Sequence, residues 1–163
     1  MDYRKLGRTD LNVSAIALGT MTWGEQNTQT EAFEQIACAK NAGINFIDTA
    51  EMYPVPPKAE TYATTERFIG NWFKERGDRA DWVLASKHGN AMGEAPNMSG
   101  YSRTWIMRAV DDSLRRLGTD YLDLYYLHRD YEGMNLEEPL RAMGDLIRAG
   151  KIRYFGLSNF RGW

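Results

Sequence analysis

The sequence predicts an α/β protein built on a parallel sheet, namely part of a (β/α)8 TIM barrel. Short apolar runs alternate with long amphipathic stretches, which gives five strands and four helices in strict alternation. The turn after the first strand reads GTMTWGEQ and lacks the G-x-G-x-x-G pattern typical of a doubly wound dinucleotide-binding sheet. Polar residues instead gather at the carboxyl ends of the predicted strands, where barrels carry their chemistry, at Asp48, Lys87, His128, Ser158 and Asn159.

The N-terminal half of the pattern begins with a hairpin. Residues 3–7 and 11–19 flank the turn Arg-Thr-Asp, and the second arm runs into the first core strand. Thr28 and Glu31 form a capping box that opens the first helix, which ends near residues 41–43, where glycine can adopt the left-handed cap. Residues 44–48 follow as a strand.

The later elements follow the same logic. Three prolines make residues 51–63 a loop, and residues 88–102, rich in Gly, Asn and Ser, are a second long loop of the kind that carries function. Asn135 and Glu138 predict another capping box. The remaining predicted elements are, in chain order, helix 63–76, strand 82–87, helix 104–117, strand 121–127, a helix ending at 149 and strand 152–157.

Length sets a further expectation. A (β/α)8 barrel takes roughly 250 residues, whereas this chain has 163 residues and stops at its fifth strand. We therefore expect residues 1–163 to be a single partial barrel domain whose C-terminal remainder is absent. Five parallel strands cannot close, so the open edges predict self-association or pairing with the missing half.

Composition narrows the class of protein. With 43% hydrophobic and 26% charged residues and a net charge of -2, the chain reads as a globular domain without the basic footprint of a nucleic-acid or anionic-membrane partner. No apolar run approaches the ~20 residues that span a bilayer. The N-terminus MDYRKLGRTD lacks the apolar core of a signal peptide, which makes the cytoplasm the expected location.

Cysteine and histidine usage points away from disulfides and metals. The single cysteine, Cys38, has no internal partner and is expected on the apolar side of the first helix as core filling. The two histidines and this cysteine do not have metal-ligand spacing, so we predict no metal site.

Four residues make a chemically coherent set. Asp48 and Tyr53 straddle the end of one strand, and Lys87 and His128 end the next two strands, so a barrel brings all four together. A tyrosine hydroxyl is a poor acid near neutral pH unless a nearby positive charge favours phenolate, and Lys87 supplies that charge. Asp48 pairs with the lysine, and the imidazole hydrogen-bonds the substrate oxygen or the phenol. The set predicts a tuned proton donor.

A donor of this kind suits the reduction of a carbonyl, in which hydride reaches carbon while tyrosine protonates the developing alkoxide. No side chain delivers hydride, so a nicotinamide cofactor is expected. Ser158 and Asn159 are placed to hold its carboxamide by hydrogen bonds.

Five motifs identify a family resemblance: Gly19-Thr20-Met21, GINFIDTAEMYPVPP, ASK at 85–87, SLRRLGTDYLDLYYLH at 113–128 and GKIRYFGLSNF at 150–160. Together they resemble the N-terminal half to two-thirds of the aldo-keto reductases, in their bacterial branch. The resemblance implies a (β/α)8 barrel closed at the bottom by the hairpin, and a catalytic tetrad of Asp48, Tyr53, Lys87 and His128 with Tyr53 as the general acid. It also implies contacts to the nicotinamide half of NADP(H) by Thr20, Met21, Gln26, Asp48, Ser158 and Asn159.

The resemblance leaves alternatives open. Preference for NADPH over NADH comes from the family alone, because its 2′-phosphate-binding residues lie in the missing part of the barrel. An NADP(H)-dependent reductase of aldehydes or ketones is the main hypothesis. A cofactor-binding regulatory protein, or an inactive truncated piece, is the alternative. His128 favours catalysis, because potassium-channel beta subunits of this family carry a different residue there.

Several residues receive a structural interpretation. His88 opens the second long loop and is expected to be solvated. Arg115 and Arg116 are expected on a solvated helix face. Trp23 follows the first strand and is a candidate for the substrate pocket, whereas one of Tyr125 and Tyr126 must face the core because strand faces alternate.

Overall fold

The computed structural model describes residues 1–162. An antiparallel hairpin, β1 (Tyr3–Lys5) and β2 (Asn12–Ser14), precedes an alternation of strands and helices. A short 3-10 helix at Arg79–Asp81, which the sequence did not predict, leads into the third core strand. The alternating elements are β3 (Leu18–Gly19), α1 (Gln29–Asn41), β4 (Phe46–Asp48), α2 (Thr64–Arg76), β5 (Val83–His88), α3 (Arg103–Leu117), β6 (Leu122–Leu127), α4 (Glu137–Arg148) and β7 (Ile152–Leu157).

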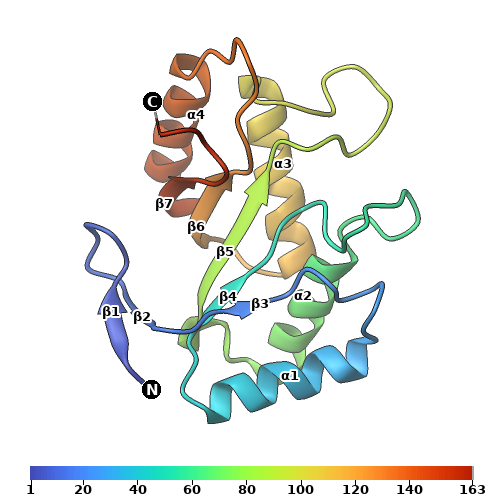
Figure 1. Cartoon of the computed structure of the whole chain (residues 1–163), viewed down its shortest axis with the longest axis vertical. Helices are drawn as coiled ribbons and strands as arrows, with labels where there is room; N and C mark the ends of the chain where they lie inside the picture. Colours follow the sequence, from blue (N-terminus) through green and yellow to red (C-terminus); the bar gives the residue numbers. More distant parts are fainter. Residues whose placement is uncertain (163) are drawn as a thin grey trace.

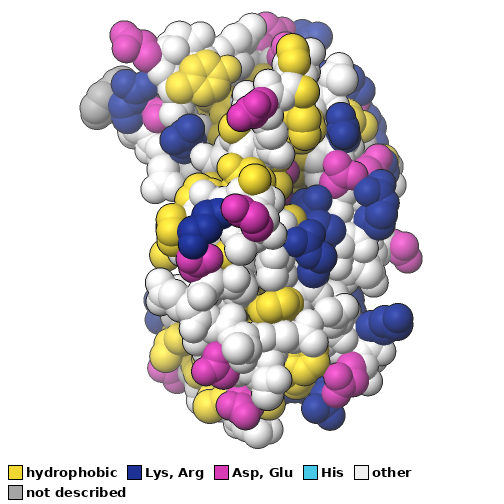
Figure 2. Space-filling view, turned by 90° about the vertical axis from the view of Figure 1, so that its right-hand side faces the viewer, with side chains coloured by type: hydrophobic (Ala, Val, Ile, Leu, Met, Phe, Trp, Pro, Cys, Tyr) yellow, Lys and Arg dark blue, Asp and Glu magenta, His cyan; other side chains and the backbone are white. Residues whose placement is uncertain are grey.

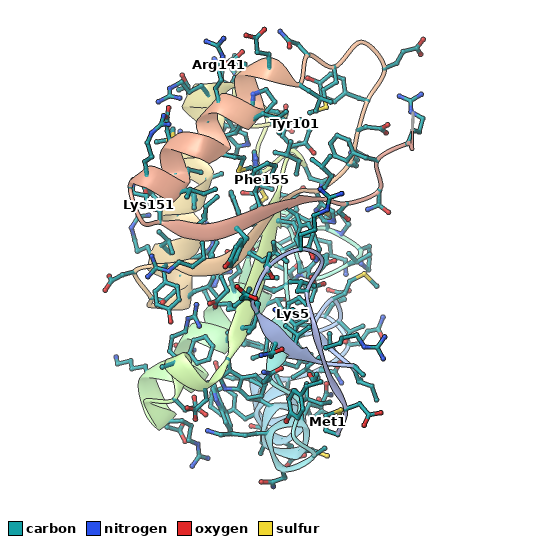
Figure 3. The ribbon with its side chains drawn as sticks, turned by 90° about the vertical axis from the view of Figure 1, so that its left-hand side faces the viewer. Met1, Lys5, Tyr101, Arg141, Lys151 and Phe155 are labelled. Atoms are coloured by element: carbon teal, nitrogen blue, oxygen red, sulfur yellow. The ribbon has the colours of Figure 1, made fainter. Side chains whose placement is uncertain are left out.

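The five core strands form one parallel sheet in the order β3-β4-β5-β6-β7, with each neighbour also next in sequence. Helices make the crossovers, and α2 and α3 lie on the side of the sheet opposite the hairpin (Figure 1). This arrangement confirms the predicted α/β class and the partial barrel. At the free edge, β7 carries the exposed side chain of Phe155 (Figure 3).

Side chains alternate between two cores because successive residues of a strand face opposite sides. The larger core lies between the sheet and the helices and includes Tyr125. The smaller core lies on the inner face, where Val13 of the hairpin packs with side chains of β4, β5 and β6, partly buried Tyr126 among its neighbours. The hairpin therefore covers the inner face, and the prediction that one of the two tyrosines is core is confirmed.

Local signals set most helix ends. The Thr28 hydroxyl accepts the Glu31 N–H at 3.3 Å while the Glu31 carboxylate accepts the Thr28 N–H at 2.7 Å, as predicted. Gly77 and Gly118 take the left-handed conformation that ends α2 and α3.

The second predicted capping box is wrong. Asn135 accepts an N–H from Glu137 at 2.9 Å, but the Glu138 carboxylate accepts the N–H of Arg103 at 2.7 Å, at the start of α3. Ser102 already satisfies the Trp105 N–H of that helix, so Glu138 satisfies a second free donor there. The Glu138 carboxylate therefore caps α3 through a tertiary contact and does not cap its own helix, α4.

Two expectations about packing are also wrong. Cys38 is exposed, because α1 buries the stripe formed by Ala32, Ile36 and Ala39 and Cys38 lies off that stripe. Trp23 does not line a pocket: it is fully buried in the larger core, and its Nε1 donates to Gln35 at 2.8 Å.

The prediction of a solvated arginine pair holds for only one member. Arg115 is exposed, but Arg116 turns inward, and its Nε donates to the fully buried carboxylate of Glu66 at 2.6 Å. Glu66 lies on α2, so this ion pair joins two helices against the sheet.

No helix within residues 1–162 is long and apolar enough to cross a membrane. Over the same residues, no group of three or more His, Cys, Asp or Glu side chains is arranged to hold a metal ion. On the face shown in Figure 2, Lys and Arg side chains are interspersed with Asp and Glu.

Candidate active site

Lys87 is the centre of the candidate site. Alternate side chains of β5 face the same side of the sheet, so Lys87 lies on the inner face with Val83 and Ala85 of the smaller core. Lys87 is near the carboxyl end of the strand. Its Nζ donates to Asp48 Oδ2 at 2.6 Å and to the carbonyl oxygen of Thr49 at 2.8 Å. The lysine side chain is only 8% exposed, so these partners offset the cost of burying its charge.

Tyr53 is the third partner of the same ammonium. Its hydroxyl oxygen lies 3.4 Å from Lys87 Nζ, which also lies 4.9 Å from the centre of the phenol ring. The loop that carries Tyr53 is fixed on both sides: Tyr53 N–H donates to the Ala50 carbonyl, and Val55 N–H donates to the Met21 carbonyl at 3.0 Å. The phenol is buried and held against the lysine.

His128 completes the set predicted as catalytic. Its ring lies edge-on to Tyr53 with centroids 6.0 Å apart, and its backbone N–H donates to the His88 carbonyl. Burial, followed by the positive charges of Lys87 and Arg129, lowers the pKa of His128 to about 4. The imidazole is therefore neutral at neutral pH.

The four residues thus lie at one end of the sheet, and three are linked directly through the ammonium of Lys87. His128 faces the phenol from the next strand. This arrangement presents a buried hydroxyl, a cation that stabilises its conjugate base, and a neutral imidazole. Such a set can donate a proton to an oxygen atom.

Apart from Asp48, which ends β4, the residues predicted to bind a cofactor follow the two edge strands of the sheet, β3 and β7. Beyond β3, Thr20 is fully buried and donates through Oγ1 to the Asp48 carbonyl at 2.9 Å. Met21 and Gln26 are exposed on the turn that follows. Beyond β7, Asn159 Nδ2 donates to the His128 carbonyl at 3.0 Å and to Ser158 Oγ at 2.9 Å. Within the described residues, hydrogen bonds join the residues after β3 to Asp48 and the residues after β7 to His128. None of the described hydrogen bonds joins the β3 residues to the β7 residues.

The prediction for His88 is wrong. β5 runs one residue further than expected, so His88 is a strand residue on the outer face, fully buried, stacked on Tyr125 and edge-on to Tyr101. Neither ring nitrogen has a hydrogen-bond partner within residues 1–162. Burial, and then repulsion from His128 once that ring is protonated, lowers the pKa of His88 to about 3.

Glu51 also lies behind the site, on the outer side of the sheet. Its N–H donates to the Lys87 carbonyl at 3.0 Å, and its Oε1 accepts the N–H of Gly89 at 3.1 Å. Burial, then the negative charge of Glu66, raises the pKa of this carboxyl to about 8. Glu51 therefore ties the loop of Tyr53 to the chain that follows Lys87.

Sequence reasoning missed Glu51, Asn90 and the carbonyl of Thr49. Glu51 stands inside the motif that suggested Asp48 and Tyr53, but an acidic residue in a loop gives no sign of burial. Asn90 lies in the long loop singled out as functional, yet only the fold shows that its Nδ2 is 2.9 Å from His128 Nδ1. Backbone acceptors such as Thr49 leave no signal in a sequence.

Comparison with known proteins identifies the family. The Aldo/keto reductase family model matches residues 15–163. Protein tas of Escherichia coli is 41% identical, over 98% of this chain and 52% of its own length. The uncharacterized oxidoreductase YrpG of Bacillus subtilis is 39% identical, over 100% of this chain and 51% of its own length. A probable voltage-gated potassium channel subunit beta of Arabidopsis thaliana is 34% identical, over 98% of this chain and 47% of its own length.

The chain spans about half the length of the curated relatives it matches. The matched region includes β3 to β7 and every residue of the candidate site. The chain therefore belongs to the aldo/keto reductase family.

Proposed function

We propose that this chain carries the catalytic residues of an NADP(H)-dependent oxidoreductase that reduces an aldehyde or ketone to an alcohol. The observation that supports it most is the buried ammonium of Lys87, held between the Asp48 carboxylate and the Tyr53 hydroxyl. Family membership and a relative named as an oxidoreductase support the same reaction class. We also propose that residues 1–163 are part of a single barrel domain.

In this proposal Tyr53 is the general acid. The bound nicotinamide supplies the hydride. Tyr53 gives its proton to the oxygen of the carbonyl substrate, and the Lys87 ammonium then donates a hydrogen bond to the phenolate left behind. Asp48 and the Thr49 carbonyl hold the ammonium so that its third N–H faces the phenol.

His128 orients the substrate. Because its imidazole is neutral at neutral pH, it has one N–H donor and one acceptor nitrogen. Asn90 occupies the Nδ1 side, which leaves Nε2 to donate to the carbonyl oxygen. The proton from Tyr53 and the hydrogen bond from His128 then converge on the same oxygen.

The residues at the rim suit the nicotinamide half of the cofactor. A carboxamide has a carbonyl acceptor and an NH2 donor, which a hydroxyl and a side-chain amide complement. Ser158 and Asn159 provide this pair beside His128, and within the described residues Asn159 uses only its Nδ2. We propose that Ser158 and Asn159 hold the carboxamide. We also propose that the nicotinamide half of the cofactor contacts Asp48 and the residues that follow β3, namely Thr20, Met21 and Gln26. The choice of NADPH follows the family resemblance.

Tyr53→Phe tests the assignment, because it removes the acidic proton and keeps the ring. We expect kcat to fall by about 10²- to 10⁴-fold, while the Kd for NADPH, measured by fluorescence titration, stays within twofold. Tyr62→Phe, a change of the same kind in the same loop, is the matched control and should alter neither value. An equal loss of turnover and NADPH binding would mean that Tyr53 is structural.

A second candidate is a cofactor-binding regulatory protein, which the relatives named as potassium channel beta subunits favour. The two candidates differ in one measurable property. A regulatory protein binds NADPH but leaves it unoxidised when a reactive aldehyde is added in excess.

A further inference from the structure

Asn90 contacts the ring of His128 from outside the predicted catalytic set. It follows β5 by two residues and belongs to the loop that leads into α3. Its side-chain Nδ2 lies 2.9 Å from His128 Nδ1, a normal hydrogen-bond distance. An amide nitrogen only donates, so Nδ1 must be the acceptor in this pair.

The backbone that carries Asn90 is firmly held. Gly89 N–H donates to the buried carboxyl of Glu51 at 3.1 Å, and the Gly89 carbonyl accepts the N–H of Gly100 at 3.1 Å. Gly89 has a φ of +123°, and a Cβ there would lie 2.3 Å from the ring of Tyr101. Only glycine allows this close approach, so Asn90 leaves the strand in a fixed direction.

The backbone of His128 is held to the same degree. Its N–H donates to the His88 carbonyl at 2.9 Å, and its carbonyl accepts from Asn159 at 3.0 Å. Tyr101, at this end of the sheet in Figure 3, donates to the Arg129 carbonyl at 2.6 Å and accepts the Arg129 N–H at 2.9 Å. The contact between Asn90 and His128 is therefore made between two anchored segments.

A neutral imidazole has two tautomers, and the hydrogen bond at one nitrogen selects between them. Burial and the nearby charges of Lys87 and Arg129 keep His128 neutral. A donor at Nδ1 stabilises the tautomer that carries its proton on Nε2. It also restricts rotation of the ring, because the amide has to meet one particular nitrogen.

We infer that Asn90 is a positioning residue that holds His128 as the Nε2–H tautomer, so that Nε2–H is available to the oxygen of a carbonyl substrate. The part that concerns the substrate rests on the proposed reductase function. The part that concerns the tautomer stands on the contact alone. A spectroscopic measurement separates the two.

Imidazole 15N NMR on the histidine-labelled protein measures the tautomer directly. The chain has two histidines, so only two rings contribute, and His128→Gln assigns them. At pH 7 we expect His128 to be Nε2–H in the wild type. Asn90→Ala should give a mixture of tautomers. Asn90→Asp puts an acceptor beside Nδ1 and should move the proton to that nitrogen.

Asn97→Asp is the matched control, because it makes the same change at an exposed position of the same loop, and asparagine and aspartate both tolerate its φ of +64°. It should leave the His128 signals unchanged. A wild-type ring protonated at Nδ1, or an Nε2–H signal that persists in Asn90→Asp, would overturn the inference. The wild-type spectrum decides the matter even if a variant fails to fold.

Kinetics test the consequence for the reaction. Loss of tautomer control costs up to roughly 10⁴-fold in rate. We expect kcat/KM to fall about 10- to 100-fold in Asn90→Ala and further in Asn90→Asp, with the Kd for NADPH unchanged. If the spectra change as expected but the wild type reduces no carbonyl, the proposed function fails while the role of Asn90 on His128 holds. Spectra that change without any loss of an existing activity would overturn the positioning role.

Discussion

Ion pairs lie on both faces of the sheet near the carboxyl ends of β4 and β5, and the two pairs differ in how far their carboxylates are buried. On the inner face, Lys87 is paired with Asp48, which remains 30% exposed. On the outer face, beneath α2 and α3, the Glu66 carboxylate is 0% exposed and is satisfied by Arg116 and by Ser86 Oγ. The carboxylate of the inner pair borders solvent, whereas the carboxylate of the outer pair is fully enclosed and its arginine is 19% exposed.

Ionisation follows the same division. The pKa of Glu51 rises to about 8 and that of His88 falls to about 3, in both cases mainly through burial, so both groups favour their neutral forms. On the outer face Glu51 and His88 therefore favour their neutral forms, and the carboxylate of Glu66 is paired with Arg116. The inner face keeps a charged pair in contact with a phenol. Both faces hold an ion pair, but only the inner pair touches a phenol, where chemistry is proposed, whereas Glu51 and His88 on the outer face favour their neutral forms.

The largest expected effect separates activity from stability on the inner face. Lys87→Met removes the cation beside Tyr53, and we expect kcat to fall by at least about 10²-fold. Lys87→Met leaves Asp48 without its cation, but that carboxylate is 30% exposed and stays solvated, so the free energy of unfolding should fall by less than the about 3–5 kcal/mol that breaking a fully buried pair costs. Steady-state kinetics and urea unfolding measure the two. If Lys87→Met lost several kcal/mol of unfolding free energy and kept most of its kcat, Lys87 would be structural, and the proposed difference between the two faces would be contradicted.

The next effect concerns stability on the outer face. Arg116→Met leaves the Glu66 carboxylate buried without its cation, which costs about 3–5 kcal/mol of unfolding free energy. Arg115→Met is the matched control, because Arg115 is 72% exposed and pairs with Asp112 at the surface. It should cost at most about 1 kcal/mol. Equal costs for the two variants would show that the Glu66 carboxylate is not enclosed in the folded protein.

Glu51→Gln sharpens the comparison through pH. The folded protein holds a proton on Glu51 up to about pH 8, whereas the unfolded chain loses it near 4.5, so this group makes the wild type less stable as pH rises between those values. Gln keeps an acceptor for Gly89 and does not titrate. The variant should gain stability over the wild type by up to about 1.4 kcal/mol per pH unit across that window. Thermal unfolding at several pH values tests this, and a constant difference would contradict it.

His88→Phe has the opposite pH signature. In the unfolded chain His88 binds a proton below its ordinary pKa of 6.5, whereas in the folded protein burial lowers its pKa to about 3. His88 therefore makes the wild type less stable as pH falls between these two values. Phe keeps the stacking on Tyr125 and removes the titration. Its stability relative to the wild type should increase as the solution is acidified. Parallel stability curves for the two proteins would mean that His88 is not enclosed.

Features encoded in a few neighbouring residues were predictable from the sequence. Thr28 and Glu31 set the start of α1, and Gly77 and Gly118 end their helices, because a cap depends on local chemistry. The strand 152–157 has the predicted bounds. The inward direction of Lys87 also follows from alternation along a strand.

Features that depend on distant partners were not predictable. Glu138 has the spacing of a residue that caps its own helix, but the fold places the N–H of Arg103 beside its carboxylate. One extra residue of β5 turned His88 to the buried outer face, since strand faces alternate. The contact of Asn90 with His128 joins two loops 38 positions apart, which no local pattern reports.

The most direct measurement is a single turnover. The protein is loaded with one equivalent of NADPH, mixed with excess reactive aldehyde, and followed by the loss of cofactor absorbance. If Tyr53 protonates the carbonyl, the wild type oxidises its bound NADPH and Tyr53→Phe does so at least about 10²-fold more slowly at equal cofactor occupancy. Bound NADPH that stays reduced in the wild type, or that is oxidised equally fast in both proteins, would contradict the account.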